Sequence, residues 1–252
     1  MGHIRYFKNF LILIAILSFA ACSSGYKLVK ANRAEYAINK GLAADSAIIR
    51  TYLPYKAQME AEMKQVIGHS EVQMPKVDTV PESLLGNFFA DATLQQARKY
   101  DPSIDFAMPS TKGGIRAALP KGNITLSNIF ELMPFENELL AFTLSGAEVQ
   151  NLLNFIAATN GQPVSGLRMK IRNKKPVEVL INGKTFDPAK TYRVLTSDYI
   201  ASGGDNARGF KNPLDKKTLD LKVRDALIGY VKDNEAAGKT INAKLDGRIT
   251  KD

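Results

Sequence analysis

Two short passages of the sequence combine glycine turns with side chains that could hold a flat, polar ligand. In the first passage, Gly113 and Gly114 precede Arg116, and Phe135 follows a proline. Glycine has no Cβ and so permits positive φ and close approach of another molecule. A guanidinium can form a fork around phosphate or ribose oxygens. An aromatic ring held on a loop by a proline is oddly placed for a core residue, which favours a binding role.

The second passage repeats this combination of an aromatic ring and a glycine turn. A strand is predicted over 191–199 and ends in Tyr199, after which Gly203, Gly204 and Asp205 turn sharply. An aspartate carboxylate can accept hydrogen bonds from two vicinal hydroxyl groups. The two passages together therefore predict a site for a ligand with a flat group and a polar edge.

Each of these side chains also has an ordinary structural interpretation, which the sequence leaves open. A ring can fill a core, an aspartate can satisfy its own turn, and an arginine can form a surface ion pair. These interpretations apply to Phe135 and Tyr199, to Asp205, and to Arg116 respectively.

The sequence contains few residues that could support metal-dependent or nucleophilic catalysis. It contains two histidines, His3 near the N-terminus and His69 alone in a predicted strand. Two-metal hydrolysis needs a cluster of Asp, His and Asn ligands, and a Ser-His-Asp triad needs a histidine beside the nucleophile. We therefore expect neither catalytic nor metal-binding residues in this chain.

Six motifs, in order, resemble the C-terminal domain of the periplasmic and ecto 5'-nucleotidases. That family includes the UDP-sugar hydrolases and 2',3'-cyclic phosphodiesterases, and order and spacing agree from about 45 to 249. Each motif alone is weak, but six in the right order are strong. They are GN-x-x-ADA at 86–92, GGIR at 113–116, PF-x-N at 134–137, LSG-x-x-V at 144–149, FDP-x-x-TY at 186–192 and Y-x-x-SGGD at 199–205.

The resemblance implies that two rings sandwich the base or another flat group of a nucleotide or nucleoside-like ligand. Such stacking contributes roughly 1–3 kcal/mol per base. It also implies an aspartate that holds ribose hydroxyls, an arginine in the glycine turn, and a polar residue beside the first ring. The substrate-binding residues expected here are Phe135, Tyr199, Asp205, Arg116 and Asn137, with Gly113, Gly114, Gly203 and Gly204.

Three positions depart from the family pattern. Tyr199 stands where phenylalanine is commoner, which keeps the stacking face. Lys112 occupies a glycine position and could either add a phosphate contact or close the turn. Glu136 places a negative charge near the first ring, where a small residue is common. These departures bear on phosphate binding more than on base stacking.

The resemblance also carries implications for partners and cofactors. In the family, the phosphatase chemistry belongs to an N-terminal domain that holds two divalent ions. We therefore expect no cofactor in this chain, and a split nucleotide hydrolase in which a separate metallophosphatase subunit holds the metals. Two alternatives remain open, a non-catalytic nucleotide- or nucleoside-binding lipoprotein and a scaffold that has lost the site.

The N-terminus resembles a bacterial lipoprotein signal, predicted over 1–22. Arg5 and Lys8 precede an apolar run over 10–21 that is too short to span a bilayer, and Cys22 follows small residues. Cys22 is the only cysteine, so no intrachain disulfide is possible. We expect lipid on Cys22 and a protein anchored in the cell envelope, facing the periplasm or exposed at the surface; ordinary signal-peptidase cleavage is the alternative.

The mixed order of helices and hairpin-like strands predicts an α+β fold with a mixed sheet and packed helices. The resemblance implies the same fold, as one 5'-nucleotidase C-terminal-like domain over 45–252 after a tether over 23–44. Apolar content of 45% and charged content of 23% are ordinary for a globular protein. The net charge is +9, but the basic residues are scattered, so we expect no nucleic-acid partner. Helices are predicted at 45–65, 82–100, 128–133 (capped by Ser127), 147–159 and 221–234, and strands at 66–72, 104–108, 139–144, 167–172, 177–181, 191–199 and 248–250.

Overall fold

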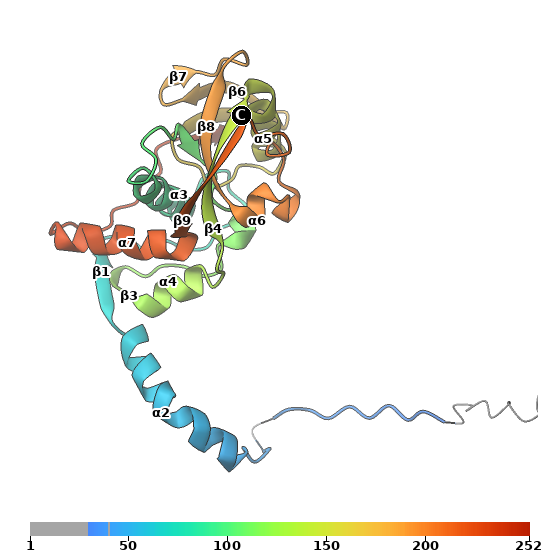
Figure 1. Ribbon diagram of the computed structural model, residues 1–252, viewed down its shortest axis with the longest axis vertical. Helices are drawn as coiled ribbons and strands as arrows, with labels where there is room; N and C mark the ends of the chain where they lie inside the picture. The colour runs from blue at the N-terminus through green and yellow to red at the C-terminus, as the bar shows by residue number, and fades with distance from the viewer. Residues whose placement is uncertain (1–29, 40) are drawn as a thin grey trace, which may run out of the picture. The chain divides into compact units, whose positions relative to one another are not determined.

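The structure, a computed structural model, describes residues 30–39 and 41–252 (Figure 1). The predicted signal, its Cys22 and the first part of the predicted tether lie outside the described residues. The chain divides after Arg50 into two units, and the second, Thr51–Asp252, contains all the described sheets. Within the described part of the chain, no helix is both long and apolar enough to span a bilayer.

Helix α2 (Ser46–Met63) is the first described element. Asp45 caps it, because its carboxylate accepts from the backbone N–H groups of Ala47 at 2.7 Å and Ile48 at 3.3 Å. Pro54 lies inside the helix without dividing it. None of its residues is buried, so its stability comes from the cap and the helical backbone rather than from core packing.

A four-stranded mixed sheet forms the centre of the domain, in the order β2-β8-β4-β9. It comprises β2 (Phe106–Ala107), β8 (Thr191–Ser197), β4 (Glu138–Ser145) and β9 (Asp215–Lys222). Strand β2 is parallel to β8, whereas β4 is antiparallel to both β8 and β9. The end of β8 therefore lies beside the start of β4, with Leu139 opposite Ser197.

Two smaller sheets complete the strands. The order β10-β5-β6-β7 joins β10 (Ile249–Lys251), β5 (Leu167–Arg172), β6 (Lys175–Ile181) and β7 (Lys184–Thr185), with β10 at an edge. An Asn182-Gly183 turn connects β6 to β7, and both turn residues have positive φ. Strand β1 (Val66–Ser70) pairs with β3 (Gly122–Thr125) in an antiparallel ribbon. The α+β prediction with a mixed sheet is confirmed.

The central sheet is covered on both faces, because successive side chains along a strand point to opposite sides. One face contributes to a core with α3 (Leu84–Ala97), α4 (Leu126–Leu132) and α7 (Val223–Ala236). The other face packs against α5 (Gly146–Ala158) and the β5–β6 hairpin. The alternation is clear in the members of the two cores, with Ala107, Leu139, Ala141 and Leu195 in the first and Phe106, Leu140, Phe142 and Val194 in the second.

Three predicted details were wrong. Helix α4 begins at Leu126 with Thr125 as its cap, in a capping box with Asn128, whereas the hydroxyl of Ser127 donates to Glu131. Strand β8 ends at Ser197, and Tyr199 lies in the short helix α6 (Asp198–Ala201), which Ser197 caps. Strands β3, β7 and β9 were not predicted. Strand β9 lies at a sheet edge with only Leu219 buried, so it carries too little apolar alternation to be recognised.

Candidate ligand-binding pocket

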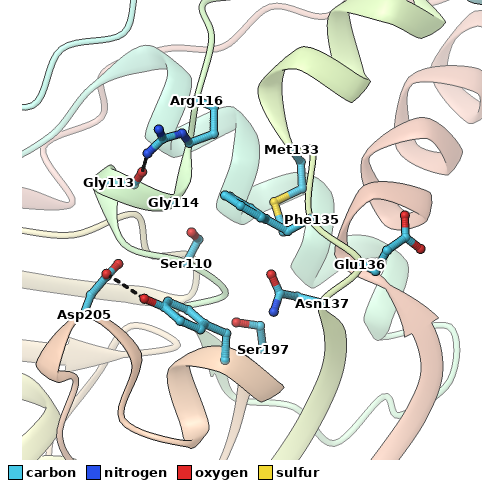
Figure 2. Close-up of a pocket in the computed structure, with 11 residues that line it drawn as sticks. Ser110, Gly113, Gly114, Arg116, Met133, Phe135, Glu136, Asn137, Ser197 and Asp205 are labelled. Carbon is cyan, nitrogen blue, oxygen red and sulfur yellow. Dashed lines mark hydrogen bonds between the residues drawn. The ribbon is translucent and has the colours of Figure 1, made fainter. Parts of the chain in front are cut away.

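A pocket of about 650 Å³ lies among the loops at one edge of the central sheet (Figure 2). Strands β2 and β8 end on this side of the sheet and the antiparallel β4 begins there, so three segments that are distant in sequence come together. The volume lies within the range of small-molecule sites. The pocket is lined by Ser110, Gly113, Gly114, Arg116, Met133, Phe135, Glu136, Asn137, Ser197, Tyr199 and Asp205.

All of the predicted site residues line this pocket except Gly203 and Gly204. Gly203 has φ of +88°, as a left-handed turn position requires. A Cβ on Gly204 would lie 2.5 Å from Cε1 of Tyr199. Gly204 therefore makes room for the ring of Tyr199, whereas a Cβ on Gly203 would meet no atom within 4 Å.

Both aromatic rings are accessible rather than part of a core. Phe135 is 43% exposed and Tyr199 is 47% exposed. Among the described residues, neither ring belongs to a ring–ring contact, so the two do not stack on each other. Packing in a core cannot account for either residue, whereas an exposed ring in a pocket offers a face for a flat ligand.

Asp205 lies at the junction of two turns. It belongs to the short 3-10 turn η2 (Gly204–Asn206) and has a left-handed backbone with φ of 52°. Its Oδ1 accepts from the hydroxyl of Tyr199 at 2.9 Å, and its Oδ2 accepts from the hydroxyl of Thr111. The hydrogen bond to Asp205 and its negative charge raise the pKa of the Tyr199 hydroxyl. The carboxylate therefore binds side chains outside its own turn.

The glycine turn is a second 3-10 turn, η1 (Lys112–Gly114), in which neither glycine has positive φ. Space is what requires glycine at one of them, since a Cβ on Gly114 would lie 2.2 Å from Oγ of Ser110. The sequence-based argument from positive φ was therefore wrong at this turn, whereas the argument from close approach applies.

Arg116 is exposed at the edge of the pocket and donates from one guanidinium nitrogen to the carbonyl oxygen of Gly113 at 3.0 Å (Figure 2). Within the described residues it forms no ion pair, so the surface ion-pair interpretation does not apply. A guanidinium has five N–H donors. Arg116 therefore retains donors for an anionic or hydroxyl-bearing ligand.

The loop that carries Phe135 is fixed by a buried arginine on α7. Arg224 donates to the carbonyl oxygens of Met133 and Phe135, each at 3.3 Å, and to the carboxylate of Glu136. Its guanidinium also lies 4.2 Å from the centroid of the Phe130 ring. Sequence reasoning missed Arg224, because its position at the start of a predicted helix gives no local sign of a partner 88 residues away.

Glu136 is neutralised by two cations. Lys222 and Arg224 both form ion pairs with it, and their hydrogen bonds lower the pKa of Glu136 to about 2. Figure 2 shows the carboxylate pointing away from Arg116 and Asp205. The negative charge that the sequence places beside the ring is thus directed to α7.

Lys112 closes its turn rather than entering the pocket. Its ammonium donates to the carbonyl oxygens of Val80 at 2.6 Å, Asn160 at 2.8 Å and Asp78 at 3.4 Å. Burial lowers the pKa of this group. Of the two roles that the sequence left open, the structure supports closure of the turn.

Asn137 connects the two ring-bearing segments. Its amide nitrogen donates to Oδ1 of Asp198 at 2.9 Å, and the same oxygen accepts from the backbone N–H of Tyr199 at 2.7 Å.

The prediction missed three further lining residues, Ser110, Met133 and Ser197, which lie outside the conspicuous motifs or show no unusual composition.

Among residues 30–39 and 41–252, no group of three or more His, Cys, Asp or Glu side chains could hold a metal ion. His69 is engaged elsewhere, since its Nδ1 lies 3.0 Å from a carboxylate oxygen of Glu235. The pocket itself offers two aromatic faces, the carboxylate of Asp205 and the guanidinium of Arg116.

Comparisons with known proteins bear on this arrangement. Residues 66–212 match the family model described as "5'-nucleotidase, C-terminal domain". The cell wall protein Lmo0130 of Listeria monocytogenes is 29% identical over 218 residues, which cover 77% of this chain and 28% of that protein. The trifunctional nucleotide phosphoesterase protein YfkN of Bacillus subtilis is 30% identical over 215 residues, or 77% of this chain and 14% of that protein.

Among solved structures, a 5'-nucleotidase precursor from Thermus thermophilus superimposes with a TM-score of 0.68 and 30% sequence identity. The match covers 80% of this chain and 42% of that one. This chain therefore spans less than half the length of each of these three proteins.

Proposed function

Because this chain belongs to the family of 5'-nucleotidase C-terminal domains, we propose that it binds the nucleoside part of a nucleotide or nucleoside-like ligand. One observation carries the proposal, namely that Phe135 and Tyr199 are both exposed within one pocket. A base between these rings would gain roughly 1–3 kcal/mol of stacking energy per base. Asp205 would accept from the sugar hydroxyls, and Arg116 would donate to the sugar–phosphate edge.

We propose further that this binding serves nucleotide hydrolysis, with a separate metallophosphatase subunit as the catalytic half. Hydrolysis by two divalent ions requires clustered oxygen and nitrogen ligands that activate water and neutralise the phosphoryl group. The described residues offer no such cluster, so we assign no metal-dependent step to them. The role of this chain in the reaction is to hold and orient the base and sugar.

A non-catalytic nucleoside-binding lipoprotein is the second candidate, and the charge of the pocket favours it. Among the described residues that line the pocket, Arg116 is the only one with a cationic side chain, and the ammonium of nearby Lys112 is held outside the pocket by three backbone carbonyls. One guanidinium suffices for a sugar or a single phosphate but offers little to a polyphosphate. A scaffold without a site is disfavoured because the two exposed rings lie together in one pocket rather than singly on the surface.

We propose a cell-envelope location with a lipid on Cys22. A signal over 1–22, a tether over 23–44 and the binding domain over 45–252 would place the domain outside the cytoplasm, facing the periplasm or exposed at the surface. The Listeria relative bears the name of a cell wall protein, which agrees with an envelope location.

Isothermal titration calorimetry of the mature chain with nucleosides and nucleotides tests the binding proposal. Phosphatase assays with Mn²⁺ or Zn²⁺ test whether hydrolysis belongs to a separate subunit. We expect binding by the pure chain without metal-dependent hydrolysis, and hydrolysis when proteins captured by the chain from an envelope extract are added. Robust activity that survives rigorous purification would refute the split enzyme. Captured fractions without activity, together with retained nucleoside binding, would favour the non-catalytic candidate.

A further inference from the structure

The hydroxyl of Tyr199 forms a hydrogen bond that a phenylalanine at this position could not form. This hydroxyl donates to Oδ1 of Asp205 at 2.9 Å, while the hydroxyl of Thr111 donates to Oδ2 of the same carboxylate. The direction of both bonds follows from chemistry, because an ionised carboxylate only accepts hydrogen bonds. Both oxygens of Asp205 are therefore held by protein hydroxyls before any ligand binds.

The groups that hold this carboxylate are themselves well fixed. Thr111 is 4% exposed, and its oxygen accepts from the backbone N–H of Gly114 at 3.3 Å, which caps η1. The Tyr199 ring packs on Gly204, where a Cβ would approach within 2.5 Å. The carboxylate thus connects η1, η2 and α6 through two hydrogen bonds, and its rotation is restrained from both sides.

An ionised carboxylate has about four acceptor positions, two on each oxygen. Two of these are occupied by Tyr199 and Thr111, which leaves about one free position on each oxygen. Two adjacent free acceptors in a fixed orientation match a pair of neighbouring hydroxyl donors. A carboxylate that could rotate would serve a single hydroxyl almost as well.

Resting on the proposed nucleoside-binding function, we propose that Tyr199 is a positioning residue whose hydroxyl, with that of Thr111, makes Asp205 selective for a vicinal diol. The pocket then prefers ribonucleosides to 2'-deoxyribonucleosides. The ring of Tyr199 contributes stacking to both classes, whereas its hydroxyl contributes only to the discrimination between them. A purely structural or stacking role for Tyr199 would alter the affinity for both classes equally.

The test measures dissociation constants for adenosine against 2'-deoxyadenosine and for uridine against 2'-deoxyuridine. Hydrogen bonds to charged groups are strong enough for a preference of about 10- to 100-fold in the wild-type chain. We expect Tyr199→Phe to bring this ratio close to one, chiefly by weakening ribonucleoside binding. Thr111→Val should lower the ratio, and Thr111→Ser, which keeps the hydroxyl, should restore it.

The outcomes separate the inference from the function on which it rests. Ribonucleoside preference that persists in both Tyr199→Phe and Thr111→Val would overturn the positioning role while leaving nucleoside binding intact. Equal affinity of the wild-type chain for both classes would also overturn it. A wild-type chain that binds no nucleoside at all would refute the proposed function, and the selectivity with it.

A measurement without ligand checks the hydrogen bond directly. NMR of ring-labelled tyrosines, with Tyr199→Phe to assign the resonance, follows ionisation of the Tyr199 hydroxyl. Its pKa should lie above the ordinary value for tyrosine and should fall in Asp205→Asn. An ordinary pKa that Asp205→Asn leaves unchanged would show that the two side chains are not joined and would contradict the inference.

Discussion

The guanidinium of Arg224 donates to the backbone carbonyl oxygen of Phe135 at 3.3 Å, joining residues 89 positions apart. The contact attaches the loop after α4 to the first turn of α7. Because Arg224 is only 6% exposed and also binds Met133 and Glu136, it holds the backbone on both sides of the exposed ring. Orientation of the Phe135 ring therefore depends on a residue that does not line the pocket.

We expect Arg224→Met to weaken nucleoside binding and to lower the free energy of unfolding by about 1.5–3 kcal/mol, the range for hydrogen bonds from a charged group. Methionine keeps much of the buried volume but offers no donor to the carbonyls of Met133 and Phe135. Urea denaturation and titration calorimetry measure the two effects. Arg224→Lys is the control, because it keeps the positive charge near Glu136 but lacks the several donors of a guanidinium. Nucleoside affinity equal to wild type in Arg224→Met would refute the role of Arg224 in orienting Phe135.

Phe135→Ala should reduce nucleoside affinity by roughly 1–3 kcal/mol, the stacking contribution of one ring. It should leave folding nearly intact, because the side chain is 43% exposed. The matched control is Phe89→Ala in the core, where exposure is 0% and truncation costs about 3–5 kcal/mol of stability. Thermal melts with and without ligand compare the two; a large loss of melting temperature in Phe135→Ala with an unchanged ligand response would contradict its assignment to the site.

The stability of the chain should fall in acid through Glu136. Its pKa is about 2 in the folded chain against an ordinary 4.5, so the unfolded state takes up the proton first as pH falls. Its contribution is complete above about pH 4.5 and disappears towards about pH 2.

Urea titrations of wild type and Glu136→Gln across this window should converge as pH falls, because the variant lacks the ion pairs throughout. A stability difference that is independent of pH would argue against the lowered pKa. Other carboxylates with lowered pKa values act in both chains and so cancel; they are Asp101, Asp233, Asp246 and Asp252.

Lys112→Met should destabilise the chain by about 1–3 kcal/mol without changing nucleoside affinity, because the ammonium binds the carbonyls of Asp78, Val80 and Asn160 outside the pocket. Chemical denaturation and calorimetry with a nucleoside and its 5'-monophosphate measure both properties. A selective loss of monophosphate binding would instead assign Lys112 to phosphate recognition.

Cys22→Ala should move the protein from the membrane fraction to the soluble periplasmic fraction or the medium, because the acyl chains that anchor a lipoprotein are attached at that cysteine. Fractionation followed by immunoblotting measures the distribution, and metabolic labelling with a fatty acid detects the lipid itself. Ser23→Ala, which leaves Cys22 in place, is the control. Unchanged membrane association of Cys22→Ala would contradict the anchor.

The sequence by itself determined the family, the fold class and most of the pocket's lining. Local features carry this information, because a cap such as Asp45, a turn such as Asn182-Gly183 and an alternating strand such as β5 act through neighbouring residues. The motifs around Phe135 and Tyr199 likewise mark segments whose rings are exposed in the pocket. Elements at a sheet edge, such as β9, were missed because little of their surface is buried.

Only the tertiary structure decided what the polar residues of these loops do. The roles of Lys112, Glu136, Arg224 and the Tyr199 hydroxyl all follow from partners that are remote in sequence or that a turn brings close. The pairing of β4 with β8 brings these partners together. It places Leu139 opposite Ser197, so the segments that carry Phe135 and Tyr199 lie at the same end of the sheet. Register is a property of the packed sheet as a whole, and hydrogen bonds between such loops exist only once it is formed.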